Sequence, residues 1–162
     1  MRIYTIGHST RSQEALMKLL TIYGVQAVID IRVIPYSRHN PQFNREEMQR
    51  VYGRCGIRYQ HLEALGGTRP PKEVTERARS CSERSRGFAE YMTSTIFREG
   101  IQHLLEMASQ EQLALMCAEQ DPTHCHRFWV ADALVERGIE VRHIINETET
   151  RDHPANLFSA WI

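Results

Sequence analysis

The sequence predicts an α/β fold, namely a single domain with a mostly parallel, five-stranded sheet and helices on both faces. Short apolar runs alternate with segments of helical period along the 162 residues. This alternation is typical of β-α-β units, in which right-handed crossovers join parallel strands. The length suits one domain, and no internal repeat or linker divides it. We therefore expect residues 1–162 to form one domain, with ligands binding outside the carboxyl ends of the strands.

The charge balance excludes one class of protein and leaves another open. Lys and Arg together number 20, as do Asp and Glu, so the formal net charge is zero with His neutral. This excludes the broad positive field of a histone-like DNA-coating protein but leaves room for a local basic pocket. The basic residues are 18 Arg and only Lys18 and Lys72. Arg binds a carboxylate or phosphate with two parallel hydrogen bonds, which Lys cannot do, and codon usage alone also enriches Arg on surfaces.

The sequence predicts a cytoplasmic protein with no membrane partner. It has no run of about 18 apolar residues, and residues 1–7 look like a strand rather than a signal peptide. No Cys-x-x-Cys pair occurs, so we expect the thiols to stay free in a reducing compartment. The four cysteines are Cys55, Cys81, Cys117 and Cys125.

The expected elements follow from the spacing of apolar residues. Strands are short apolar runs, whereas helices repeat apolar residues every three or four positions. Glycines end three of the helices, and Asp121-Pro122 resembles an N-cap followed by proline at the first helical position. The predicted strands are 3–7, 27–32, 57–62, 113–117 and 141–145, and the predicted helices are 12–23, 44–55, 88–109 and 121–137.

Two segments lie outside this alternation. Residues 68–87 contain two adjacent prolines and five arginines, which predicts a long mobile loop. Residues 146–162 form a C-terminal tail that is polar at first and apolar at its end, so we expect it to be able to dock a partner or to form a homo-oligomer. The histidines outside the site are expected in the core at His143 and at the surface at His103 and His153.

Polar residues follow four of the predicted strands. Because the carboxyl ends of parallel strands meet at one edge of a sheet, we expect these residues to converge on one site. Small and hydroxyl residues at a helix start also suit an anion, although Ser9 or Thr10 can equally be a plain N-cap, and the glycine spacing matches neither a P-loop nor a dinucleotide fingerprint. The residues expected to bind an anion are Ser9, Arg11, Arg32, Arg38, Arg69 and Arg127.

These motifs give the chain a family resemblance. It resembles the bacterial and archaeal domain-of-unknown-function family 488, in order and over nearly its whole length. The resemblance implies an α/β fold and a polar cluster at the strand ends, and it specifies no reaction. The matching stretches are TIGHSTR (5–11), DIRVIPYSRHNPQF (30–43), GIRYQHLEALGGTR (56–69), MCAE (116–119), CHR (125–127) and VRHI (141–144).

Three kinds of chemistry are compatible with the cluster. Cys125, near a helix start and next to His126 and Arg127, suits a stabilised thiolate. The Cys-x5-Arg loop of cysteine phosphatases is absent, and buried thiols are often only packing groups. Metal binding is not predicted, because the seven-residue gap between Cys117 and Cys125 is no standard zinc spacing and neighbouring helical side chains diverge by about 100°.

Acid–base chemistry is the third kind. Asp30 and Glu119, with His8 or His61, could transfer protons. Glu119 is the better candidate, because Asp30 beside Arg32 can equally be a structural ion pair, which would lower its pKa. The main hypothesis is an enzyme acting on a phosphate-bearing ligand, such as a nucleotide, a derivative or a nucleic-acid end. The alternatives are a non-catalytic nucleotide or nucleic-acid binding module and a thiol-based redox or sulfur-transfer protein. No cofactor is specified. The expected catalytic residues are Glu119, Cys125, Cys117, His8 and His61, supported by Asp30, Ser37 and His126.

Overall fold

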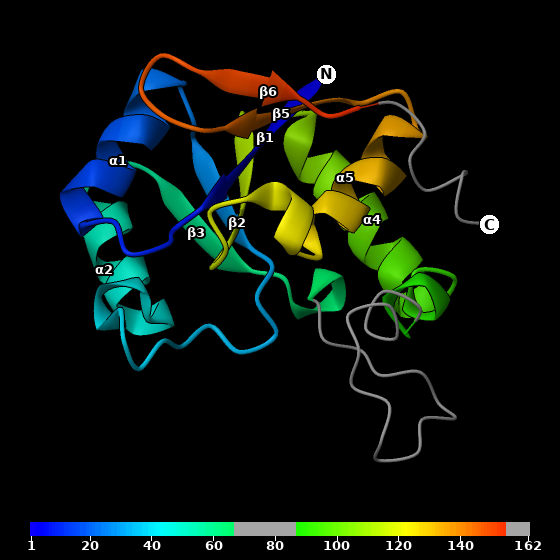
Figure 1. Ribbon diagram of the computed structural model, residues 1–162, viewed down its shortest axis with the longest axis horizontal. Coiled ribbons are helices and arrows are strands. Elements are labelled where there is room, and N and C mark those ends of the chain that lie inside the picture. Colours follow the sequence, from blue (N-terminus) through cyan, green and yellow to red (C-terminus); the bar gives the residue numbers. More distant parts are fainter. Residues whose placement is uncertain (67–86, 155–162) are drawn as a thin grey trace.

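The computed structural model describes residues 1–66 and 87–154, which form an α/β fold around a six-stranded mixed sheet (Figure 1). The strand order is β3-β2-β4-β1-β5-β6, and every neighbouring pair is parallel except β5 and β6. The predicted fold class is therefore confirmed. The strands are β1 (Arg2–Gly7), β2 (Ala27–Asp30), β3 (Arg58–His61), β4 (Leu113–Cys117), β5 (Glu140–Ile144) and β6 (Thr150–Asp152).

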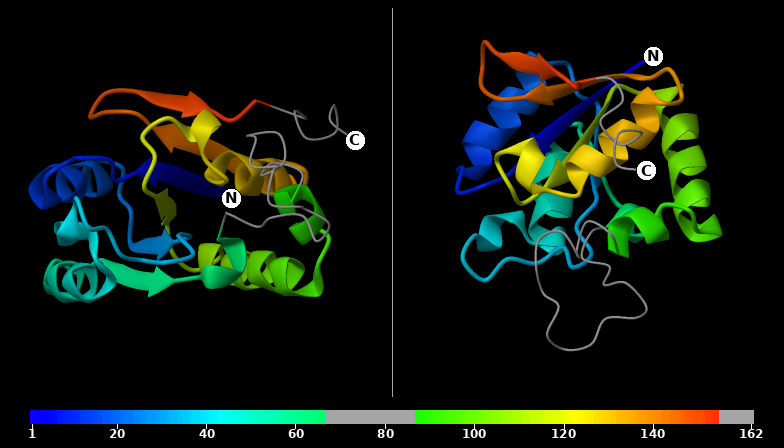
Figure 2. Two further views of the ribbon diagram at one scale, coloured as in Figure 1. Left: turned by 60° about the horizontal axis from the view of Figure 1, so that its bottom comes forward. Right: turned by 45° about the vertical axis from the view of Figure 1, so that its right-hand side comes forward.

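Helices cover both faces of the sheet, as expected. On one face α1 (Gln13–Ile22) and α2 (Arg45–Arg54) pack together, and on the other face lie α4 (Thr95–Ala108) and α5 (Arg127–Val135) (Figures 1 and 2). Residues 87–91 are also helical. Short 3-10 turns complete the connections at η1 (Pro41–Phe43), η2 (Glu63–Leu65) and η3 (Pro122–His124).

Two apolar cores result from the alternation of side chains along the central strands. Successive residues of a strand point to opposite faces, so Ala114 and Met116 of β4 pack against α1 and α2. Leu113, Leu115 and Cys117 of the same strand pack on the side of α4 and α5. All five residues of β4 are buried, which is typical of a parallel strand covered on both faces.

The chain changes sides between β1 and β4. After β1 it passes through α1 on one face, and after β4 it passes through α5 on the other face. Adjacent parallel strands whose connections leave to opposite faces form the topological switch point, where α/β proteins bind ligands. The loops that follow β1 and β4 are joined by hydrogen bonds from the backbone N–H of His8 to the carbonyl of Cys117 and from that of Ser9 to Ala118, both at 2.9 Å.

Gly7 is required for this contact between the two loops. A Cβ atom at Gly7 would lie 1.8 Å from the carbonyl oxygen of Glu119. Only a residue without a side chain therefore lets the chain after β4 lie directly against the end of β1. Ser9, two residues later, has a φ of 48°, a left-handed conformation that is rare for residues other than glycine. Such strain persists where the surrounding contacts impose it.

The prediction of five strands was one strand short. Residues Thr150–Asp152, predicted as irregular tail, form β6 and pair antiparallel with β5. This strand lies at the edge of the sheet and its residues are half-buried or exposed, so it carries no apolar alternation by which the sequence could reveal it. Residues 67–86 and 155–162 lie outside the described residues, and with them Arg69, most of the predicted loop 68–87 and the apolar end of the tail.

The helix predicted over residues 121–137 is interrupted. Asp121 does act as a cap, since its carboxylate accepts a hydrogen bond of 2.9 Å from the backbone N–H of Thr123, but the turn it begins is the short η3. Cys125 is then extended, with φ −137° and ψ 147°, and α5 begins only at Arg127. The interruption directs the Cys125 side chain into the core beneath α5.

No helix within residues 1–66 and 87–154 is long and apolar enough to cross a membrane.

We predict that Gly7→Ala destabilises the fold by about 1–3 kcal/mol or more, because the added methyl group overlaps backbone that cannot move independently of β1. The free energy of unfolding, measured by urea denaturation, checks this. Gly53→Ala is the matched control, because a Cβ at Gly53 meets nothing within 4 Å and alanine favours a helix interior by about 1 kcal/mol. Equal stability of the two variants would contradict the account.

Candidate functional site

The polar residues at the carboxyl edge of the sheet form two clusters on opposite faces, not the single site expected from the sequence. One cluster is built around Asp30 and Arg32 and lies on the face covered by α1 and α2. The other contains Cys117, Cys125 and Arg127 and lies beneath α5. Backbone hydrogen bonds between the loops after β1 and β4 join the two.

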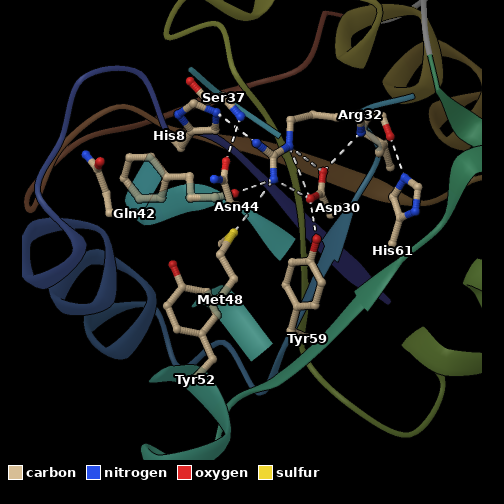
Figure 3. Close-up of polar contacts among 12 residues, drawn as sticks. His8, Asp30, Arg32, Ser37, Gln42, Asn44, Met48, Tyr52, Tyr59 and His61 are labelled. Atoms are coloured by element: carbon tan, nitrogen blue, oxygen red, sulfur yellow. Dashed lines mark hydrogen bonds and ion pairs between the residues drawn. The ribbon is translucent and has the colours of Figure 1, made fainter. Parts of the chain in front are cut away.

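The first cluster centres on a buried ion pair (Figure 3). The Arg32 guanidinium donates two parallel hydrogen bonds to the carboxylate of Asp30, from Nε to Oδ1 at 2.9 Å and from Nη2 to Oδ2 at 2.6 Å. Nη2 also donates to the carbonyl of Phe43 at 2.7 Å, and the Tyr59 hydroxyl donates to Oδ2 of Asp30 at 2.5 Å. Arg32 is 7% exposed and Asp30 is fully buried. The Asp30–Arg32 ion pair is thus present, and the Arg32 guanidinium is occupied by contacts within the protein.

His8 belongs to the same cluster, and both of its ring nitrogens are engaged (Figure 3). Nδ1 donates to the carbonyl of Ser9 at 2.8 Å, which leaves Nε2 to accept from Nη1 of Arg32 at 3.4 Å. The ring stacks on Phe43 with centroids 4.5 Å apart. Burial lowers the pKa of His8, and the charge of Arg32 lowers it further, although the hydrogen bond to Ser9 opposes both. His8 is therefore a neutral ring that holds Arg32 in place.

Ser37 and His61 hold the chain around this ion pair. The Ser37 hydroxyl accepts a hydrogen bond of 3.0 Å from the backbone N–H of Asn40, and the Ser37 backbone N–H donates to the side chain of Asn44 at 2.7 Å. Nε2 of His61 donates to the carbonyl of Arg32 at 2.6 Å. The supporting role expected for Ser37 stays a prediction. For His61 the hydrogen bond is a positioning contact, and the expected catalytic role stays a prediction.

The second cluster is a pair of buried thiols. Cys117 ends β4 and is 1% exposed, and Cys125 lies just before α5 and is 9% exposed. Their Sγ atoms are 2.7 Å apart, and both cysteines are free. Among the described residues, no group of three or more His, Cys, Asp or Glu is arranged to hold a metal ion.

Arg127 places a buried positive charge on this thiol pair. It is 1% exposed, and its Nη1 donates to Cys117 Sγ at 3.4 Å and to the carbonyl of Glu119 at 3.1 Å. Nη2 donates to the carbonyl of Gln120 at 3.2 Å, while Nε is buried without a hydrogen-bond partner. Within the described part of the chain, no carboxylate forms an ion pair with Arg127.

The two thiols differ in acidity because of these neighbours. Burial acts to raise the pKa of Cys117, but the hydrogen bond from Cys125 and the charge of Arg127 outweigh it and lower the pKa below its ordinary value. Cys125 has a raised pKa, first because it donates to Cys117 and second because it is buried. Within the pair, Cys117 is therefore the more acidic thiol and Cys125 the less acidic one.

His126 supports Cys125 as a neutral ring. Nε2 donates to the carbonyl of Ile31 at 2.9 Å, so Nδ1, which lies 3.5 Å from Cys125 Sγ, carries a lone pair. Burial is the main cause that lowers the pKa of His126 to about 4. Its edge meets the ring of Phe88, with centroids 5.9 Å apart. The supporting role expected for His126 stays a prediction.

Arg11 and Glu119 lie at the border of the thiol cluster. The half-buried Arg11 donates from Nε to the carbonyl of Gly7 at 3.3 Å and from Nη2 to that of Ile145 at 3.2 Å. Burial and the charge of Arg127 lower its pKa. The Glu119 side chain is exposed, and it is the backbone carbonyl of Glu119 that contacts Arg127. The proton-transfer role of Glu119 therefore stays a prediction, as does the anion-binding role of the exposed Arg38.

A buried chain of hydrogen bonds near the C-terminus was missed from the sequence. Thr5 Oγ1 meets His143 Nδ1 at 2.6 Å, His143 Nε2 meets His153 Nδ1 at 2.9 Å, and His153 Nε2 meets Asp132 Oδ1 at 2.6 Å. His143 is in the core as expected, but the prediction of a surface position for His153 was wrong, since it is 8% exposed. The one available signal was Asp132, a lone carboxylate in the apolar run of α5.

The fold and the site together define an α/β protein with a buried thiol pair at the carboxyl edge of a parallel sheet. The chain belongs to the family described as Domain of unknown function DUF488, whose model matches residues 12–134. The matched part contains Asp30, Arg32, Cys117, Cys125 and Arg127. No curated protein and no solved structure is detectably similar to the chain.

We predict an acid sensitivity that arises from His143. Burial, and then the charge of His153, lower the pKa of His143 to about 3 in the folded protein, whereas an unfolded histidine has a pKa of about 6.5. Below about pH 6.5 His143 is protonated in the unfolded chain but stays neutral in the folded protein. The free energy of unfolding therefore decreases as the pH falls toward 3. Between about pH 7 and pH 5 this residue should account for roughly 2 kcal/mol.

Urea unfolding of the wild type and of His143→Gln at both pH values measures this contribution. The variant should lose less free energy of unfolding than the wild type on acidification, because His8 and His126 contribute equally to both proteins. Equal losses would show that His143 is not protected from protonation in the folded state.

Proposed function

We propose that this protein is an enzyme of thiol chemistry, in which Cys117 and Cys125 act at the carboxyl edge of the sheet. The observation that carries the proposal is the buried guanidinium of Arg127, which donates to the sulfur of Cys117 and, within the described residues, pairs with no carboxylate. The proposal takes up the thiol-based alternative offered by the sequence.

The electrostatics of Arg127 support a thiolate at Cys117. A buried charge is costly unless an opposite charge compensates it. The carbonyls of Glu119 and Gln120 supply hydrogen bonds but no net charge. The Cys117 sulfur is the contacting group that can ionise, and a thiolate, unlike a thiol, is nucleophilic at neutral pH.

The start of α5 supports the same chemistry at Cys125. The backbone N–H of Arg127, the first residue of α5, donates to Cys125 Sγ at 3.4 Å. N–H groups at a helix N-terminus stabilise negative charge on a sulfur. With Cys117 as the thiolate, the pair keeps one proton, on Cys125. Because each sulfur has a donor that stabilises its ionised form, this proton can move from Cys125 to Cys117.

The contacts of the arginines favour thiol chemistry over an anion-binding site built from arginines. The Arg32 guanidinium is bound to Asp30, that of Arg11 to two carbonyls, and that of Arg127 to two carbonyls and a sulfur. Arg69 lies outside the described residues.

A phosphate-bearing ligand remains our second candidate, because one observation favours it. Arg11 is half-exposed, and the charge of Arg127 contributes to lowering its pKa, so the two guanidinium groups are close enough to repel. Neither has a carboxylate partner within the described residues. An anionic group of a nucleotide or nucleic-acid end, bound beside Arg11, would relieve this repulsion. Turnover would then distinguish an enzyme from a non-catalytic binding module.

We predict that the thiol pair reacts with iodoacetamide with an apparent pKa below the ordinary thiol value of about 8.5. The measurement uses a Cys55→Ser/Cys81→Ser background, so that only Cys117 and Cys125 report. In that background Arg127→Met should slow alkylation at neutral pH at least tenfold, because loss of the cation raises the thiol pKa by about one unit or more. Arg127→Lys, which keeps the charge, should lose less.

Arg137→Met is the matched control, since Arg137 follows the same helix and is exposed. It should alkylate like the parent. An apparent pKa at or above the ordinary value that does not respond to Arg127→Met would refute the thiolate.

We further predict that millimolar inorganic phosphate or a nucleoside monophosphate raises the melting temperature of the wild type, and that Arg11→Met reduces the rise. Arg50→Met, which removes an exposed arginine paired with Glu47 on α2, should leave the shift unchanged. A steep loss of affinity with salt would point to a nucleic acid as the ligand. Absence of a shift with both compounds would remove the anion site and leave the thiol proposal untouched.

A further inference from the structure

We propose that Cys117 and Cys125 are a redox couple that cycles between dithiol and disulfide by exchange with a disulfide-bearing substrate. This inference rests on the proposed thiol function and goes further, because it names the substrate class and assigns a different role to each sulfur.

The positions of the two sulfurs are already those of a pair that can bond. Their separation of 2.7 Å compares with about 2.05 Å in a disulfide. The cysteines come from different elements, the end of β4 and the extended residue before α5, so the packing of the fold brings them together. Each sulfur accepts a hydrogen bond. The donor to Cys117 is Nη1 of Arg127, and the donor to Cys125 is the backbone N–H of Arg127 at the start of α5.

The exposure of the two cysteines sets the order of the steps. Cys125 is 9% exposed and Cys117 is 1% exposed. An external disulfide can therefore reach Cys125 before it reaches the more deeply buried Cys117. Cys125 is the attacking residue, and Cys117 is the resolving residue.

The exchange balances without any further reactant. In the first step Cys125 Sγ attacks one sulfur of the substrate disulfide and passes its proton to the Cys117 thiolate, and the other substrate sulfur leaves as a thiolate. In the second step Cys117 Sγ attacks Cys125 Sγ and breaks the mixed disulfide, and its proton goes to the departing substrate sulfur. The protein loses two electrons and the substrate disulfide is reduced to one thiol and one thiolate.

His126 positions the attacking sulfur. Its Nε2–H is bound to the carbonyl of Ile31, so Nδ1 offers Cys125 a second acceptor at 3.5 Å besides Cys117. The thiol hydrogen of Cys125 thus has two acceptors, Sγ of Cys117 and Nδ1 of His126.

Glutathione disulfide, added to the full-length protein in the Cys55→Ser/Cys81→Ser background, tests the proposal by intact mass. The parent should lose two hydrogens and retain no glutathione. Cys117→Ser should stop at a stable adduct of one glutathione on Cys125. Cys125→Ser should react at least tenfold more slowly than Cys117→Ser, because its remaining thiol is the inner one.

Circular dichroism establishes that each serine variant is folded. Should Cys117→Ser fail to fold, acid quenching of the parent reaction at early times replaces it, and peptide mapping should then find the transient adduct on Cys125. Accumulation of adducts on the parent without an internal disulfide would overturn the proposal, as would equal reactivity of the two serine variants.

The alkylation experiment separates this failure from failure of the thiol function. A thiol of low pKa that forms no internal disulfide would refute the redox couple alone. Thiols that are neither acidic nor able to form the disulfide would refute both.

Discussion

The carboxyl edge of the sheet is organised by the buried positive charge of Arg127. This residue begins α5, is 1% exposed and pairs with no carboxylate of the described chain. Its guanidinium donates hydrogen bonds to the carbonyls of Glu119 and Gln120 and to the sulfur of Cys117. The backbone carbonyl of Glu119 also lies directly against Gly7, where no side chain fits. The contacts of this cation therefore position the chain after β4 and act to lower the pKa of Cys117.

The two clusters at the carboxyl edge of the sheet differ in how their buried charges are paired. On the face of α1 and α2, Asp30 neutralises Arg32, and the Tyr59 hydroxyl also donates to the carboxylate, so that the buried charges are balanced. A fully paired network of this kind rigidifies the strand ends. On the face of α5, Arg127 pairs with no carboxylate of the described residues, and its charge acts to lower the pKa of Cys117. We therefore place the proposed chemistry of this edge in the thiol cluster.

Much of the fold could be predicted from the sequence, because apolar period and caps are local signals. Strand Leu113–Cys117 was predicted with its observed bounds, and Ser12 was correctly placed at the start of α1. β6 was missed because an exposed edge strand needs no apolar pattern. The partners of Arg32 and Arg127 could not be predicted, since the sequence shows which residues end strands but not toward which face each side chain turns. His153 was misplaced for a similar reason, because its partners Asp132 and His143 are distant in the chain.

The most direct test of this account is the ultraviolet absorbance of thiolate in the Cys55→Ser/Cys81→Ser protein at neutral pH. The reduced protein should show the absorbance of one thiolate per chain, which titrates away on acidification. It should be absent from Cys117→Ser and much weaker in Arg127→Met. A protein that shows no thiolate at neutral pH, or one whose thiolate persists in Cys117→Ser and Arg127→Met alike, would contradict the pairing of Arg127 with Cys117.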